Sequence, residues 1–111
     1  MELITSLISF PIGVISIIAM GILKIFPPKN INSWYGYRTR NSKKNMRNWV
    51  LAQKTSANIG LVVSIIVILY QILIDMIFEQ GSLTRFTTMV LWSIGMVLTI
   101  YLTERKLKGH P

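Results

Sequence analysis

Three long stretches without a charged residue constrain the fold of this chain more than any other feature. They cover residues 3–23, 55–74 and 86–103. A helix rises about 1.5 Å per residue, so roughly 20 residues cross a hydrocarbon core of about 30 Å. A water-soluble domain of 111 residues has too much surface for its volume to bury all three stretches. The sequence therefore predicts an all-α integral membrane protein with three transmembrane helices.

We expect the spans at residues 3–26, 55–78 and 86–103, in a single domain that covers residues 1–111. A cleavable signal peptide is the alternative for the first stretch. It would begin with basic residues and end at a small-residue cleavage site, whereas this chain begins Met1-Glu2 and leaves the stretch through Pro27-Pro28. We therefore expect the first span to be retained.

The positive charge of the chain, formally +8, is distributed unevenly between the connections. Only Arg85 lies in the second connection, with Asp75 and Glu79. All the other basic residues lie before the second span or after the third: Lys24, Lys29, Arg38, Arg40, Lys43, Lys44, Arg47, Lys54, Arg105, Lys106 and Lys108. Cytoplasmic loops carry such an excess, so the pattern predicts a multipass protein with the N-terminus outside and the C-terminus in the cytoplasm. It favours anionic lipid head groups as partners over nucleic acid.

Small and polar residues recur at helical spacing within the spans and predict their contact faces. In the first span Pro11 should kink the helix near Gly13. In the second, Gln71 and Asp75 continue a small-residue face, and Gln71 should contact protein rather than lipid. Either a hydrogen bond inside the bundle or a contact with a bound peptide or ion explains Gln71. The small and polar contact residues, apart from Gln71 and Asp75, are Ser6, Ser9, Gly13, Ser16, Ser56, Gly60, Ser64, Trp92, Ser93, Gly95 and Thr99.

The polar segment 27–54 forms the first cytoplasmic loop in this arrangement. Ser42 is a suitable N-cap for a helix over residues 42–54. In that helix Met46, Trp49 and Val50 alternate with basic residues at helical spacing. We therefore predict an amphipathic juxtamembrane helix with its aromatic side toward the membrane and its basic side toward anionic head groups.

Side-chain catalysis has few candidate residues. His110 is the single histidine, next to the final residue, and the four acidic residues have no partner at metal-ligand spacing. We expect no enzyme activity, no catalytic residues, no metal and no cofactor. A proton-coupled exporter is the alternative for a membrane protein of this length, but it needs a carboxylate inside the bilayer, and the three uncharged stretches contain none.

The first loop also contains a dense polar and aromatic motif. Aromatic residues of this kind often only anchor a protein at the head-group level. Here Gly36 separates two tyrosines, and two arginines follow at positions 38 and 40. A membrane anchor does not require so specific an order of residues. The candidate binding or structural residues are Asn32, Trp34, Tyr35, Gly36, Tyr37, Arg38, Thr39, Arg40, Ser42, Asn45 and Trp49, with Gln71 and Asp75 as intramembrane polar residues.

The run from Pro27 through Tyr-Gly-Tyr-Arg-Thr, followed by Asn41-Ser42, Asn45, Trp49 and Ala52-Gln53, resembles the motif of the SdpI family of small bacterial membrane proteins. The likeness covers almost the whole chain, since family members place this motif after one span and before two more. The founding member has additional N-terminal spans, which this chain lacks.

The resemblance implies an immunity or resistance protein in the bacterial cell membrane that protects the cell against a secreted toxic peptide or bacteriocin. The alternative it implies is a regulatory scaffold whose basic loop sequesters a cytoplasmic partner such as a transcriptional repressor. Candidate partners are therefore the toxic peptide, a cytoplasmic regulator and lipid, and the oligomeric state stays open. We expect Arg38, and with it Arg40, to make a specific contact that a lysine cannot replace, because a guanidinium stacks on aromatic rings and donates paired hydrogen bonds.

Overall fold

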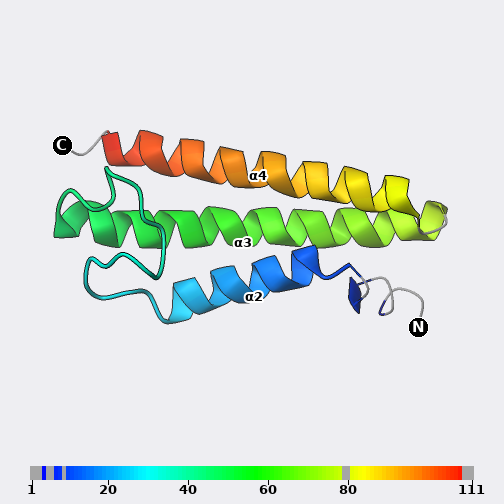
Figure 1. The fold of residues 1–111 in the computed structure, drawn as a ribbon, viewed down its shortest axis with the longest axis horizontal. Helices are drawn as coiled ribbons and strands as arrows, with labels where there is room; N and C mark the ends of the chain where they lie inside the picture. The colour runs from blue at the N-terminus through cyan, green and yellow to red at the C-terminus, as the bar shows by residue number, and fades with distance from the viewer. Residues whose placement is uncertain (1–3, 5–6, 9, 79–80, 109–111) are drawn as a thin grey trace.

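The computed structural model describes residues 4, 7–8, 10–78 and 81–108. Three helices run along its length: α2 (Ile12–Ile25), α3 (Met46–Ile77) and α4 (Ser82–Lys108), and the described residues include no strand. Figure 1 shows α3 in the middle, with α2 on one side of it and α4 on the other. The end of α2, the start of α3 and the end of α4 lie at the same end of the bundle. The all-α prediction is confirmed.

The two longer helices, α3 and α4, are long and apolar enough to cross a membrane. Their outward faces expose large apolar side chains, such as Leu69 and Phe86, that water would not favour. Helix α2 is equally apolar but has only 14 residues, fewer than the roughly 20 that cross a bilayer. The described residues therefore contain two helices of spanning length rather than the predicted three.

The sequence predicts a helix that kinks near Gly13, whereas in the structure α2 starts just after Pro11. Pro11 is the N-cap of α2, so the helix begins after the proline rather than passing through it. Proline has no N–H and fixes its own φ, which suits a helix start better than an interior. Gln71 Nε2 donates a hydrogen bond of 3.1 Å to the Phe10 carbonyl at this break. The expectation that Gln71 contacts protein is thus confirmed.

Helix α3 begins later than predicted and is continuous with the second span. Asn45, not Ser42, is the N-cap: its side chain accepts a hydrogen bond of 2.8 Å from the Asn48 N–H. The amphipathic helix predicted over 42–54 is therefore wrong in its start, and it runs on into the second span as one helix. The 32 residues of α3 extend about 48 Å, which exceeds a bilayer core of about 30 Å. A helix of this length therefore extends beyond the hydrocarbon of any bilayer that it crosses without tilting.

Small residues form the contacts between the helices, as their spacing predicts. The hydroxyl groups of Ser16 and Ser64 are buried 2.6 Å apart between α2 and α3. A Cβ on Gly13 would lie 2.7 Å from Ile68 Cγ1, and one on Gly60 would lie 2.5 Å from Met20 Sδ. On the other side of α3, Gly95 packs against Val63. Of the other predicted contact residues, Ser56 and Thr99 are buried, Trp92 is partly buried, Ser93 is exposed, and Ser6 and Ser9 lie outside the described residues.

Candidate functional site

Residues 27–45, which we call the motif loop, fold back against the first turns of α3. The loop begins with a turn made by Asn32, whose Oδ1 accepts hydrogen bonds from the N–H groups of Trp34 (3.0 Å) and Tyr35 (2.8 Å). Asparagine side chains favour this local bonding. The Tyr35 hydroxyl then donates to the Phe26 carbonyl at 2.7 Å. The Asn32 bonds shape the turn, and the Tyr35 bond ties the first half of the loop to the end of α2.

Gln53 on α3 holds the centre of the motif loop. Its Oε1 accepts from the Tyr37 N–H at 2.7 Å, and its Nε2 donates to the Tyr37 carbonyl at 2.7 Å. The side-chain amide thereby pairs with the loop backbone as a neighbouring strand would. Gly36 makes this approach possible: its φ is +96°, and a Cβ there would lie 2.6 Å from Gln53 Oε1 and 2.8 Å from Pro28 Cγ.

The second half of the loop is a turn closed by Thr39 and Ser42. The Thr39 N–H donates to Ser42 Oγ at 2.8 Å, and the Ser42 N–H donates to Thr39 Oγ1 at 3.2 Å. Ser42 is completely buried, and its hydroxyl also lies 2.8 Å from the Thr39 carbonyl. Asn48 on α3 then donates to the Asn41 carbonyl at 3.0 Å. The Ser42 hydroxyl is engaged inside this turn, which explains why it does not cap α3.

Trp49 lies beneath the motif loop instead of facing lipid. Its side chain has no exposed surface, and its Nε1 donates to the Pro28 carbonyl at 2.8 Å. A buried indole needs such a partner for its N–H. The expectation that Trp49 faces the membrane is wrong, because the loop offers both apolar cover and a hydrogen-bond acceptor. Trp49 is the residue on which the loop packs.

Tyr37 extends from the loop to α4. Its hydroxyl lies 3.4 Å from the Ile100 carbonyl. Burial of the side chain and then the nearby Glu104 carboxylate raise the pKa of Tyr37 to about 12. The phenol therefore stays protonated at neutral pH. One motif residue thus contacts α3 through its backbone and α4 through its ring.

The exposed part of the motif is aromatic and basic. Trp34 is 80% exposed, with its ring centroid 6.5 Å from that of Tyr35. Arg38 and Arg40 are exposed, and Arg38 Nη1 donates to the Ser33 carbonyl. Asn45 is exposed at the start of α3. This surface offers cationic and aromatic groups to a partner.

Gln71 and the partly buried Asp75 lie toward the opposite end of α3, away from the motif loop. The structure therefore does not bring the intramembrane polar residues together with the motif. Gln53, in contrast, was not among the predicted site residues although it holds the loop. Its signal in the sequence is the spacing Trp49, Ala52, Gln53, Ser56, which places a glutamine on a buried helix face.

Among the described residues no group of three or more His, Cys, Asp or Glu side chains is placed to hold a metal ion. A pocket of about 330 Å³ lies where the motif loop meets α2 and α4. Tyr35, Gly36 and Tyr37 line it with residues of the two helices, including Ala19, Met96 and Thr99. The pocket connects the motif to the apolar faces of the bundle.

Comparison with known proteins gives two matches. Residues 29–103 match the SdpI/YfhL protein family. The chain is also 36% identical, over 96 residues, to the uncharacterized protein YfhL of Bacillus subtilis strain 168. The aligned region covers 86% of this chain and 82% of that protein. No solved structure matches the chain.

Proposed function

Since this chain belongs to the SdpI/YfhL protein family, we propose that it is an immunity protein of the bacterial cell membrane that protects the cell against a secreted toxic peptide. The supporting observation is the extent of the family match, which covers nearly all of the motif loop and both long helices. The motif is thus shared together with the membrane segments that hold it.

In this proposal the protein binds the peptide and blocks its action without cleaving it. The pocket of about 330 Å³ between the motif loop, α2 and α4 offers an apolar site for a hydrophobic peptide side chain. Tyr35 and Tyr37 at its rim supply hydrogen-bonding groups beside apolar ring surface. Such a site suits a peptide that inserts into the bilayer.

The proposed membrane arrangement has three spans. In this arrangement α2 belongs to the first span, and α3 and α4 are the second and third. Every lysine and arginine except Arg85 lies toward the end of the bundle that contains the motif loop. By the positive-inside rule this end faces the cytoplasm.

Expression in a toxin-sensitive cell tests immunity. We expect the protein to raise survival while the amount of intact toxin in the medium stays constant. Ala19→Phe should place a ring in the pocket and reduce protection, whereas Ile18→Phe, on the exposed face of the same helix, should not. Toxin fragments that accumulate in step with protection would show hydrolysis and contradict the proposal.

Arg38 tests the role of the motif surface in the same assay. A specific guanidinium contact requires that Arg38→Lys reduces protection although the charge is kept. Lys43→Gln, which removes a charge from the same loop, should have little effect. Equal and mild losses from both variants, at unchanged membrane levels, would mean that the loop is only an anchor.

A regulatory scaffold is the second candidate, favoured by the exposed side chains of Trp34 and Arg40 in the motif loop. These residues would bind a soluble cytoplasmic protein. Full-length protein in nanodiscs should then retain such a partner from a cytosolic extract, and Trp34→Ala with Arg40→Gln should abolish retention. If the double variant still protects cells from the toxin, the two functions are separate.

A further inference from the structure

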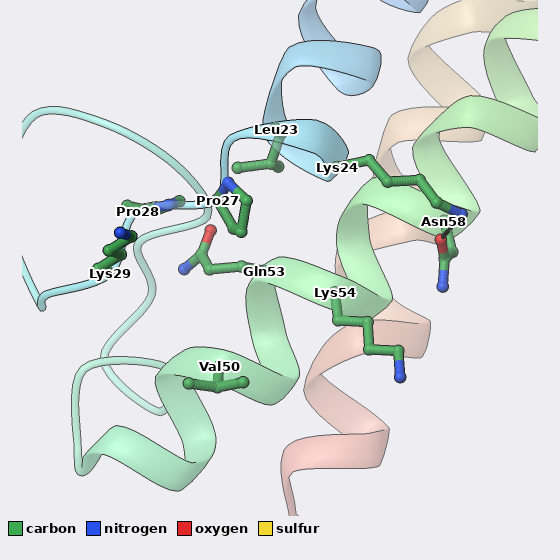
Figure 2. A pocket seen from close by; sticks show the side chains of 9 residues that line it. All are labelled: Leu23, Lys24, Pro27, Pro28, Lys29, Val50, Gln53, Lys54 and Asn58. Atoms are coloured by element: carbon green, nitrogen blue, oxygen red, sulfur yellow. Dashed lines mark hydrogen bonds between the residues drawn. The ribbon is translucent and has the colours of Figure 1, made fainter.

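A second pocket, of about 510 Å³, lies between the end of α2 and the first turns of α3. Figure 2 shows the side chains around it. They come from α2, from the segment that follows it and from α3. The lining residues are Leu23, Lys24, Pro27, Pro28, Lys29, Val50, Gln53, Lys54 and Asn58.

The lining of this pocket combines an apolar wall with three positive charges. Leu23, Pro27 and Val50 supply apolar surface. Lys24, Lys29 and Lys54 all have exposed side chains, and the described residues that line the pocket include no acidic side chain. No negative side chain among these lining residues balances the charge of the three lysines. Its chemistry fits an amphiphile with a negative head.

Lys24 is placed to close the pocket between the two helices. Its Nζ donates a hydrogen bond of 2.7 Å to Asn58 Oδ1 on α3. An ammonium has three donors, so this bond leaves Lys24 able to bind an anion as well. Lys54 lies one turn before Asn58 on the same helix, and Figure 2 shows the Lys24 and Lys54 side chains on the same side of the pocket.

The pocket lies at the level where phospholipid phosphates are found. Lys24 directly follows the uncharged stretch 3–23, and Lys54 directly precedes the uncharged stretch 55–74. The two lysines therefore mark the same boundary of the hydrocarbon on neighbouring helices. Basic pockets between helices at the cytoplasmic boundary are known to bind anionic head groups.

We propose that this pocket binds one anionic phospholipid, with its phosphate between Lys24 and Lys54 and its glycerol and upper acyl chain against Leu23, Pro27 and Val50. The apolar wall distinguishes this site from one for free phosphate, which would gain nothing from it. It also distinguishes the site from the diffuse attraction of a basic loop to the membrane surface, because the two lysines come from two helices around one cavity. The proposal does not depend on the immunity function.

The test uses the full-length protein in a neutral detergent and measures lipid binding by native mass spectrometry. The probes are phosphatidylglycerol and phosphatidylcholine with identical acyl chains. We expect phosphatidylglycerol to bind more tightly. Each lysine near an anionic lipid contributes about fivefold in affinity, so Lys24→Gln with Lys54→Gln should weaken phosphatidylglycerol binding by roughly 25-fold.

Matched variants separate the pocket from general charge. Lys43→Gln with Lys44→Gln removes the same charge from the motif loop and should change affinity by less than about twofold if the effect is local. Lys24→Arg with Lys54→Arg should restore most binding. Equal losses from both glutamine pairs would overturn the proposal in favour of diffuse attraction.

Two further measurements keep the proposal falsifiable if the double variant folds poorly. Val50→Trp keeps every charge and fills part of the pocket from an exposed helix position, so it should weaken phosphatidylglycerol binding at an unchanged melting temperature. Glycerol 3-phosphate, which has the charge without acyl chains, should not displace the lipid at equal concentration. Unchanged binding in Val50→Trp, or full displacement by glycerol 3-phosphate, would contradict a lipid site.

Discussion

The side-chain amide of Gln53 pairs with the backbone of Tyr37 through two hydrogen bonds, each 2.7 Å long, so that one residue of α3 fixes the centre of the motif loop. Gln53 is 98% buried in this pair, with 2% of its surface exposed. Ser42 Oγ also contacts the Tyr37 carbonyl, but its distance of 3.3 Å is longer than the bond from Gln53, so it does not replace that bond.

Gln53→Glu should destabilise the protein by about 2–3 kcal/mol, because it replaces a donor by a carboxylate that faces the Tyr37 carbonyl. Thermal unfolding in detergent measures the change. Lys44→Gln, an exposed substitution in the motif loop, serves as the control and should leave the melting temperature unchanged. A Gln53→Glu protein as stable as the wild type would mean that the pair does not hold the loop.

Gly36→Ala should cost about 2 kcal/mol or more, since the residue has a φ of +96° and the added Cβ meets Gln53 and Pro28. Gly21→Ala is the matched control, because no atom lies within 4 Å of its Cβ position and the residue is helical. That change should be neutral or stabilising by up to about 1 kcal/mol. The same measurement applies, and equal effects of the two substitutions would argue against a strained loop position.

Trp49→Phe should cost about 1–3 kcal/mol, because the Pro28 carbonyl loses its donor and the buried volume decreases. Trp34→Phe should be silent in stability, since Trp34 is largely exposed. Fluorescence provides an independent check in a Trp92→Phe background. A soluble quencher should reach Trp34 and not Trp49, and quenching of both would contradict the packing of the loop on Trp49.

The raised pKa of Tyr37, about 12 against its usual value of 10, predicts the pH range over which its contribution to stability is lost. The folded protein keeps the phenol proton to higher pH than the unfolded chain does. The contribution is therefore complete below pH 10 and declines as the pH rises from 10 to 12. Phenolate absorbance during an alkaline titration should contain a late component that Tyr37→Phe removes. If that component persists in the variant, the assignment to Tyr37 is wrong.

The membrane topology can be tested with single cysteines, since the chain contains none of its own. A cysteine at Ser82, at the start of α4, should react with an impermeant thiol reagent in intact cells. Cysteines at Ser33 and Lys108, at the opposite end of the bundle, should react only after lysis. If the cysteine at Ser33 is labelled in intact cells, the protein has the opposite orientation in the membrane.

The features that depend on one helix at a time could be predicted from the sequence. The uncharged stretches predicted three spans, of which the described residues contain two as helices of spanning length. The spacing of small residues identified Gly13, Ser16, Gly60 and Ser64 as helix contacts. These predictions need only the period of the helix and the chemistry of lipid, in which polar and small residues turn inward.

The features that depend on how the loop folds back could not be predicted in the same way. Trp49 has the spacing of a lipid-facing residue, and only the position of the Pro28 carbonyl shows that it is covered. Ser42 and Asn45 are both good N-caps, and the choice between them depends on the contact of Ser42 with Thr39. Helical spacing and the family motif both point to Gln53, but its partner is a backbone group 16 residues away, which the sequence does not identify.

The continuity of α3 has a mechanical consequence. Gln53 holds the motif loop near one end of this helix, and Gln71 holds the Phe10 carbonyl 18 residues later, about 27 Å along the same axis. A straight helix cannot rotate or shift at one of these points without moving the other. A displacement of the chain at Phe10 would therefore strain the Gln53–Tyr37 pair at the other contact, so that α3 couples the two contacts as one rigid element.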